Sequence, residues 1–162
     1  MQVPDYLRSV FLCDDIRIEN TGREIAIGIF PGILSFPRLP VVIQALVVRF
    51  ELFFAGVPQE VFSIRIVDPS KNVLVEQKMA LQFGDWSMPG SAIASFQGFI
   101  FPAKGTYEVL TATSGEEWAR AYSFVVEQID PSVVKQRFTE FMRKVQDNAE
   151  KNAKLMSADG AS

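Results

Sequence analysis

The feature that most restricts the fold of this 162-residue chain is a two-residue repeat of apolar side chains over its first 129 positions. The repeat is clearest in residues 41–54, where one face is apolar while Arg49 and Glu51 fall on the other. The apolar face consists of Leu46, Val48, Phe50, Leu52 and Phe54. Such alternation is typical of a strand with one face in a core and the other near solvent.

The same alternation returns along the chain. Further strands are expected at residues 6–19, 24–30, 62–66, 73–79, 93–101, 106–113 and 118–129. Turn-forming groups such as Asn20-Thr21-Gly22 and Asp68-Pro69 separate them. About eight strands with no helical pattern between them predict a mainly β fold, an antiparallel β-sandwich of immunoglobulin-like or C2-like type. Fourteen phenylalanines agree with a β-rich interior.

Residues 101–107, Phe-Pro-Ala-Lys-Gly-Thr-Tyr, combine a tight corner with the start of a strand. This order is compatible with a tyrosine corner, in which the hydroxyl of Tyr107 ties a chain crossover to the edge of a sheet. An ordinary half-buried tyrosine is the alternative at this position.

At Asp130 the pattern changes from strand to helix. Asp130 is a favourable N-cap residue and Pro131 suits the first helical position. An apolar stripe then recurs at steps of four, three and four residues, which predicts an amphipathic helix. The stripe consists of Val134, Phe138, Phe141 and Val145.

The chain is therefore expected to have three parts. Residues 1–129 form the β-sandwich domain, residues 130–156 the amphipathic C-terminal helix, and residues 157–162 a disordered tail. We expect the stripe to pack on the chain's own strands. A seam for self-association and a docking element for a partner are the alternatives.

The sequence contains no histidine and a single cysteine. Ser-His-Asp triads, Cys-His pairs, histidine-ligated zinc or haem and intrachain disulfides are therefore excluded. Two aspartates follow Cys13, and their charge disfavours a reactive thiolate, so we expect a small buried side chain there. Gly28 and Gly32 lack the lysine and the following helix of a phosphate-binding loop. No catalytic residue, cofactor-binding residue or metal ligand is assigned.

The densest acidic group contains Asp14, Asp15 and Glu19. On a strand Asp15 and Glu19 share a face with Arg17 between them, whereas Asp14 points the opposite way. We interpret the group as a solvated charge ladder. Part of a calcium site and a weak carboxylate-based catalytic pair are the alternatives. Acidic residues in expected turns add slightly to the calcium alternative, namely Asp68, Asp85, Glu116 and Glu117.

Aromatic residues gather in the loop at residues 82–90, which contains Phe83, Trp86 and Met88. Such a loop suits a recognition surface, or it covers an open end of the strands; we expect the second. Trp118 is expected to pack on a strand rather than to serve as a ligand platform.

The net charge of −3 is unevenly distributed. Residues 131–162 have six basic and four acidic residues, which leaves ten basic against fifteen acidic residues in the rest. Because an acidic body repels phosphate backbones, nucleic-acid binding is not expected. The first residues lack the features of a signal peptide, and no stretch reaches the roughly 18 unbroken apolar residues of a membrane span. We therefore expect a cytoplasmic protein that does not contact a membrane.

Residues 11–23, Phe-Leu-Cys-Asp-Asp-Ile-Arg-Ile-Glu-Asn-Thr-Gly-Arg, are followed by Gly-Ile-Phe at 28–30. This pattern resembles an uncharacterised bacterial family, a domain of unknown function. Its members begin with Cys-Asp-Asp-hydrophobic-Arg-x-Glu and have a later Phe-Pro-x-x-Gly-x-Tyr element, matched here at 101–107. The resemblance covers most of residues 1–129 and implies a compact β-sandwich of bacterial or phage origin. It carries over no catalytic residue, ligand or partner.

The function predicted from these observations is a non-enzymatic protein-binding or scaffold module. It presents loops, a sheet edge or the C-terminal helix to a protein partner or to a second copy of itself. The alternative is a calcium-dependent binding module or a weak carboxylate enzyme that uses the region of Asp14, Asp15 and Glu19.

Overall fold

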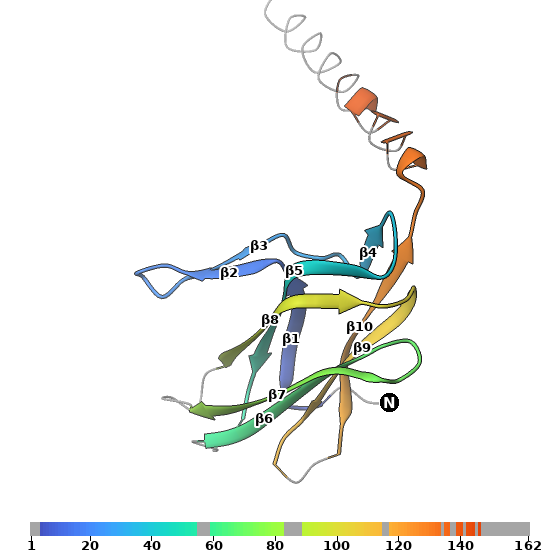
Figure 1. The fold of residues 1–162 in the computed structure, drawn as a ribbon. Helices are drawn as coiled ribbons and strands as arrows, with labels where there is room; N and C mark the ends of the chain where they lie inside the picture. The colour runs from blue at the N-terminus through green and yellow to red at the C-terminus, as the bar shows by residue number, and fades with distance from the viewer. Residues whose placement is uncertain are drawn as a thin grey trace, which may run out of the picture. The chain divides into compact units, whose positions relative to one another are not determined.

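The computed structural model describes residues 4–54, 59–82, 89–114, 117–133, 135–136, 139–140, 142–144 and 146. The chain divides into two units, Met1–Gln128 and Ile129–Ser162. Within its described part, the first unit has ten strands in three sheets, where the sequence predicted about eight (Figure 1). The fold is mainly β, as predicted.

The strands of the three sheets are as follows. The three-stranded sheet has the order β1 (Leu7–Cys13), β5 (Val41–Leu52) and β8 (Gly90–Phe101). The five-stranded sheet has the order β4 (Ile33–Phe36), β10 (Ala119–Gln128), β9 (Gly105–Ala112), β6 (Gln59–Val67) and β7 (Val73–Gln82). The smallest sheet pairs β2 (Asp15–Ile18) with β3 (Glu24–Ile27). The pairings are antiparallel except that of β4 with β10, which is parallel and corrects the expectation of an all-antiparallel arrangement.

One hydrophobic core lies between the two larger sheets. The predicted apolar face of β5 is confirmed: Leu46, Val48, Phe50 and Leu52 are fully buried, and Phe54 packs partly buried against the core. The Phe50 ring meets the Phe62 ring of β6 edge-on, with 5.1 Å between their centroids. Contacts of this kind join the sheets, since burial of large apolar side chains is the main favourable term in folding.

Tyr107 forms the predicted tyrosine corner. Its hydroxyl donates a hydrogen bond to the carbonyl oxygen of Ala103 at 2.6 Å and accepts one from the Ala103 N–H at 3.3 Å. The side chain is fully buried between Phe101 and Phe124, whose ring centroids lie 5.3 and 5.5 Å from its own. The alternative of an ordinary half-buried tyrosine is therefore wrong.

Residues 6–19 form two strands rather than the single strand expected. The chain bends at Asp14, and β2 leaves the three-stranded sheet to pair with β3. The Asp14 N–H donates to the Ile27 carbonyl at 3.0 Å, so the returning chain passes close to the bend. Gly28 has a φ of 67°, and a methyl group added there would overlap the Asp14 carboxylate. A glycine at this crossing permits the close approach.

The second unit has helical backbone at residues 131–133, 135–136, 139–140, 142–144 and 146. Asp130 caps its start as predicted, because its Oδ1 accepts a hydrogen bond from the Ser132 N–H at 2.8 Å. The four residues of the apolar stripe lie outside the described residues, so the amphipathic helix over 130–156 and the disordered tail stay predictions. No helix in the described part of the chain is long and apolar enough to cross a membrane.

Candidate interaction surface

The β2–β3 hairpin forms a separate two-stranded sheet beside the two larger sheets (Figure 1). Its turn is closed by hydrogen bonds from the Glu19 N–H to the Arg23 carbonyl at 2.8 Å and from the Gly22 N–H to the Glu19 carbonyl at 2.9 Å. Gly22 has a φ of 80°, which glycine adopts without steric cost. The predicted Asn20-Thr21-Gly22 turn is confirmed.

Large apolar side chains are exposed on and beside this hairpin. The exposed fractions are 66% for Ile18, 44% for Ile25, 37% for Ile27 and 58% for Ile29. In the register of the hairpin, Ile25 lies opposite Arg17 and Ile27 opposite Asp15, so both isoleucines share one face. A two-stranded ribbon cannot bury both of its faces by itself. Grouped exposed apolar side chains of this kind are typical of a contact surface.

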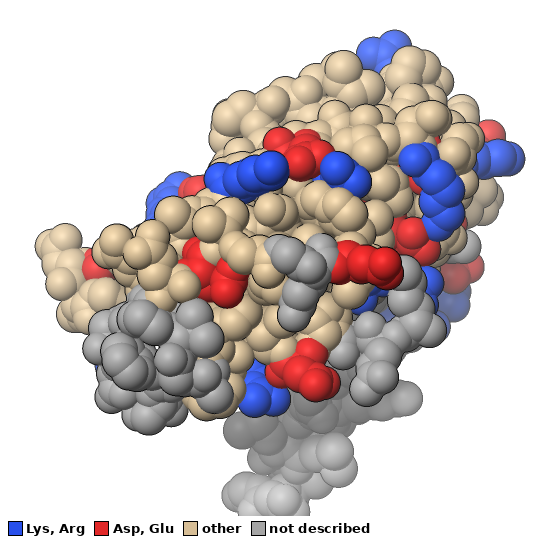
Figure 2. Space-filling model, turned by 90° about the horizontal axis from the view of Figure 1, so that it is seen from below, with Lys and Arg blue, Asp and Glu red and all other residues tan. Residues whose placement is uncertain are grey.

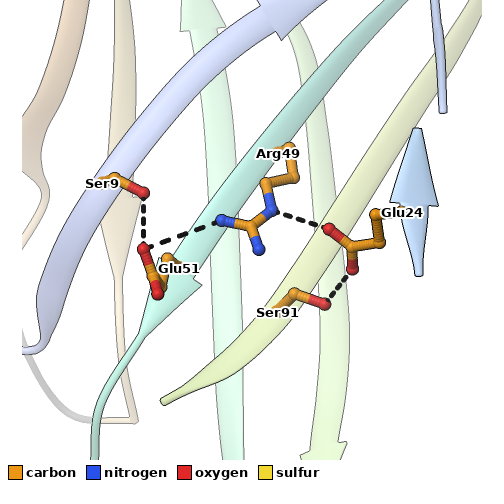
Figure 3. Close-up of polar contacts among 5 residues, drawn as sticks. All are labelled: Ser9, Glu24, Arg49, Glu51 and Ser91. Atoms are coloured by element: carbon orange, nitrogen blue, oxygen red, sulfur yellow. Dashed lines mark hydrogen bonds and ion pairs between the residues drawn. The ribbon is translucent and has the colours of Figure 1, made fainter. Parts of the chain in front are cut away.

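An ionic network joins the turn end of the hairpin to the three-stranded sheet (Figure 3). Arg49 on β5 donates from Nε to Glu24 Oε2 on β3 at 2.9 Å, and Ser91 Oγ on β8 donates to Glu24 Oε1 at 2.5 Å. Arg49 Nη1 also lies 3.8 Å from Glu51 Oε2, which accepts a hydrogen bond from Ser9 Oγ at 2.9 Å. Four strands thus meet through five polar side chains.

The surroundings of Glu24 favour its ionised form. The hydrogen bond from Ser91, followed by the bond and charge of Arg49, holds the pKa of Glu24 below its usual range against the opposing effect of burial. The side chains of Arg49 and Glu24 are only 19% and 25% exposed. Partly buried ion pairs are screened by salt less than exposed ones. The hairpin is therefore held to the three-stranded sheet near its turn.

A groove of about 490 Å³ lies beside the Glu24–Arg49 pair that anchors the hairpin, between the hairpin and the three-stranded sheet. Phe11, Ile16 and Ala26 line it together with four polar residues of the network, Glu24, Arg49, Glu51 and Ser91. The Arg49 guanidinium lies 5.9 Å from the centre of the Phe11 ring and faces two carboxylates. Because Glu24 and Glu51 already neutralise the Arg49 guanidinium, this group presents no unpaired charge to a ligand in the groove.

The three acidic residues singled out from the sequence do not converge. Asp15 Oδ2 pairs with Arg17 Nε at 3.2 Å, which agrees with the predicted charge ladder. Glu19 is not part of that ladder, because it lies in the turn and accepts a hydrogen bond from Thr21 Oγ1 at 3.3 Å. Asp14 lies at the bend, where it and Asp15 line a separate groove of about 570 Å³. Within the described ranges, no three acidic or cysteine side chains are arranged to hold a metal ion.

Two further predictions can be placed. Cys13 is fully buried, as expected; burial raises the pKa of its thiol, and the charges of Asp14 and Asp15 raise it further. Trp118 packs against a strand, as expected, because the Arg65 guanidinium of β6 lies 4.0 Å from the centre of its ring.

The remaining acidic and aromatic candidates do not form a site in the described structure. Asp68 is buried in its turn, where its carboxylate accepts hydrogen bonds from the backbone and side chain of Asn72 at 2.8 and 2.9 Å. Glu117 is exposed. Asp85, Glu116 and the aromatic residues of the 82–90 loop lie outside the described residues.

Figure 2 shows basic and acidic side chains interspersed on one face of the molecule, with uncharged areas between the charged groups. Among the described residues, Glu108 pairs with Lys71 at 2.6 Å and with Arg120 at 3.4 Å. The charges visible on this face are therefore mixed in sign.

Residues 8–127 match the family of unknown function DUF6941. The chain belongs to this family. The matched range contains both motifs on which the resemblance rested, residues 11–23 and 101–107, and the predicted family of unknown function is confirmed. For a DUF6941 domain, membership by itself assigns no activity.

The other comparisons do not assign a function. A search of curated proteins gives no match to the chain. Similar solved structures include a β-glucosidase from Listeria innocua in complex with isofagomine, with 18% identity and a TM-score of 0.36 over 60% of this chain and 15% of that chain. The chain thus spans about 15% of the length of that enzyme.

Two shorter structures are similar over most of their own length. An immunoglobulin-like protein from Pseudomonas aeruginosa has 12% identity and a TM-score of 0.35 over 74% of this chain and 98% of that chain. A CARDB domain from Pyrococcus furiosus in complex with di-metal ions has 9% identity and a TM-score of 0.32 over 80% and 94%. At these TM-scores neither likeness supports a function.

The sequence reasoning missed the hairpin and its anchor. Residues 6–19 and 24–30 are predicted there as two strands of the β-sandwich, with no separate hairpin. A signal was present, since isoleucines alternate on both sides of a short Asn-Thr-Gly turn and would need burial on two faces. The Glu24–Arg49 pair has no sequence signal, because only the fold brings these residues together.

Proposed function

We propose that this DUF6941 domain is a non-enzymatic protein-binding module that presents the β2–β3 hairpin to a protein partner. The observation that carries the proposal is the exposure of Ile18, Ile25 and Ile27 on an element that Glu24 fixes to the body. Because the hairpin is held in place before binding, its ordering costs little when a partner arrives. The partner surface that fits it is apolar at its centre with charged groups at its rim.

We infer in addition that the two larger sheets form an immunoglobulin-like β-sandwich that serves as a rigid support. The shared core between the sheets and the tyrosine corner support this inference. Binding residues are commonly carried by loops and hairpins on such a scaffold. The cytoplasmic location, the bacterial origin and a partner for the C-terminal helix stay predictions.

A displayed library of random peptides, selected on the immobilised full chain, supplies ligands for a direct test. The affinity of a selected peptide is then measured by fluorescence anisotropy. We expect Ile25→Lys together with Ile27→Lys to weaken binding at least tenfold, because burial of each isoleucine is worth about 1.5–3 kcal/mol and every 1.4 kcal/mol is tenfold. Both changes place charge on exposed positions, so the fold is expected to persist.

The matched control is Val42→Lys, which changes a side chain that is 63% exposed outside the hairpin. Peptides that bind the hairpin keep their affinity for this variant. The proposal is wrong if repeated selections give no binding peptide, or if the hairpin variant and the control bind selected peptides equally well.

A further inference from the structure

β7 forms one edge of the five-stranded sheet. In the described part of the chain its only strand neighbour is β6, with which nine of its ten residues pair, Leu74 being skipped. The strand contains no proline or glycine, and its one register irregularity lies at its start, between Ile66 and Val67 of β6. A long regular edge presents backbone N–H and C=O groups in a row to any strand that approaches.

The two faces of β7 differ in character. Val75, Gln77 and Met79 lie opposite the core residues Ile66, Ile64 and Phe62, so their side chains are on the core side. Glu76 and Lys78 lie opposite Arg65 and Ser63 on the outer face. The charges therefore point to the solvent side of the sheet, and no charged side chain from Val75 to Leu81 points toward the core.

We propose that β7 pairs antiparallel with β7 of a second copy of this chain, about a twofold axis at Gln77. Under this symmetry a residue a given number of positions before Gln77 lies opposite the residue the same number of positions after it. Glu76 then lies opposite Lys78 of the second copy, and Lys78 opposite its Glu76. On the core side Val75 lies opposite Met79 of the second copy, and Met79 opposite its Val75.

The two charge pairs arise when β7 meets a second β7, because an acid and a base, Glu76 and Lys78, stand on either side of Gln77. Opposite charges on directly opposed strand positions stabilise a sheet, and like charges in the same positions destabilise it. A register shifted by two residues would lose both charge pairs and place Lys78 opposite Lys78, or Glu76 opposite Glu76. The twofold arrangement satisfies both of them and also matches the apolar side chains, as an isologous interface requires.

The sheet holds Glu76 in position for this contact. Its Oε2 accepts a hydrogen bond from Arg65 Nε at 2.7 Å, and the Arg65 guanidinium lies over the Trp118 ring. The carboxylate has a second oxygen, which can accept a bond from Lys78 of the second copy. Contacts thus run from Trp118 through Arg65 to Glu76, and they end at the edge of the sheet with an ordered carboxylate. A basic side chain of the second copy would extend this row of contacts.

Charge reversal in separate chains gives a sharp test. Lys78→Glu places glutamates opposite glutamates, and Glu76→Lys places lysines opposite lysines, so each variant repels its own copy. We expect either change to raise the dimer dissociation constant about 30-fold, as measured by sedimentation equilibrium. An equimolar mixture of the two variants restores both opposite-charge contacts, so it should form a heterodimer of the wild-type affinity class.

Lys104→Glu is the matched control, since it makes the same charge change at an exposed position outside β7 and should leave the dimer intact. Rescue in the mixture shows that the single variants are folded. The inference is overturned if the wild-type chain is a monomer at every concentration. It is also overturned if the mixture fails to associate, or if both reversals dimerise as well as Lys104→Glu; the last result would place the interface elsewhere.

The register is tested separately by Gln77→Cys. Directly opposed strand residues have Cα atoms about 4.5–5.5 Å apart, within the range that a disulfide spans. Mild oxidation should therefore cross-link two copies of this variant, and the native Cys13 does not compete because it is fully buried. Gln82→Cys is the control: its thiols would be ten residues apart along the paired strands. Equal cross-linking of both variants would refute the proposed axis.

The peptide-binding proposal concerns a different surface and does not depend on this one. A hairpin that binds peptides in a monomeric chain would leave the proposed function intact and remove the dimer. A dimer that binds no peptide would do the reverse.

Discussion

Replacing Tyr107 by phenylalanine removes one hydroxyl from a fully buried ring and leaves its packing in place. The change deletes the 2.6 Å bond to the Ala103 carbonyl and the 3.3 Å bond from the Ala103 N–H. A neutral hydrogen bond contributes about 0.5–1.5 kcal/mol, and a buried group left without a partner costs about 1–3 kcal/mol. Because Ala103 is exposed, water can reach its freed groups, which limits the loss. We expect Tyr107→Phe to lower the free energy of unfolding by about 1–2 kcal/mol.

Urea denaturation followed by circular dichroism measures this loss, and a melting experiment should show a decrease of about 2–8 °C. Tyr122→Phe is the matched control, since the Tyr122 hydroxyl has no hydrogen-bond partner in the described part of the chain. We expect it to change stability by less than about 0.5 kcal/mol. If the two variants are equally stable, the hydroxyl of Tyr107 does not hold the corner and the reasoning is refuted.

Three other changes follow from the same geometry. Glu24→Gln removes the ionic bond to Arg49, so amide hydrogen exchange in β2 and β3 should accelerate while that of β5 is unchanged; uniform acceleration would contradict a local anchor. Gly28→Ala should cost about 1–2 kcal/mol from its positive φ, and more than Gly98→Ala, which has a φ of 63° but an open surrounding, because only the first displaces Asp14. Hydrogen bonds from Ser91 and Asn72 hold the pKa values of Glu24 and Asp68 below their usual range, so both acids stabilise the fold above about pH 4.5. That contribution is lost as the pH falls through their folded pKa values. A pH series of urea midpoints should show the loss, with a shallower slope for Glu24→Gln.

The period of the apolar pattern predicted the strands of the body well. In β5 the faces of Leu46, Val48 and Phe50 follow from alternation alone, because burial of one face is the dominant energetic demand on such a strand. The Asp68 turn was also predictable, since aspartate and proline favour it locally. Local chemistry and core formation agree at these positions.

Other parts of the fold depend on contacts that alternation does not encode. β4 lies between Pro31 and Pro37, in a stretch that reads as irregular, and forms because its backbone pairs in parallel with β10. The two strands at 6–19 are separated at Asp14 by the passing chain at Gly28. In β8 the buried face changes from Phe96 to Phe99 around Gly98, whose φ is 63°, so one strand presents both parities to the core. These features interrupt the alternation of apolar residues, so short stretches of sequence do not predict them.

The candidate surface was predictable only in outline. Exposed Ile25 and Ile27 have the same sequence pattern as core isoleucines, and only their strand's departure from the larger sheets separates the two cases. The edge position of β7 is likewise a property of strand order. Its charges, by contrast, are visible in the sequence: Glu76 and Lys78 flank Gln77, and their meaning changes once the strand is known to be an edge.

The two proposed contacts are compatible with each other, because they use different sheets. β7 belongs to the five-stranded sheet, whereas the hairpin is anchored on β5 and β8 of the three-stranded sheet. Pairing through β7 would leave the Glu24 anchor untouched, and a dimer would therefore present two hairpins. Two linked binding elements gain affinity for a partner with repeated sites without any new contact at either hairpin. A contact area as small as one hairpin gives weak binding alone. Pairing through β7 would therefore raise the affinity for such a partner above that of a single chain.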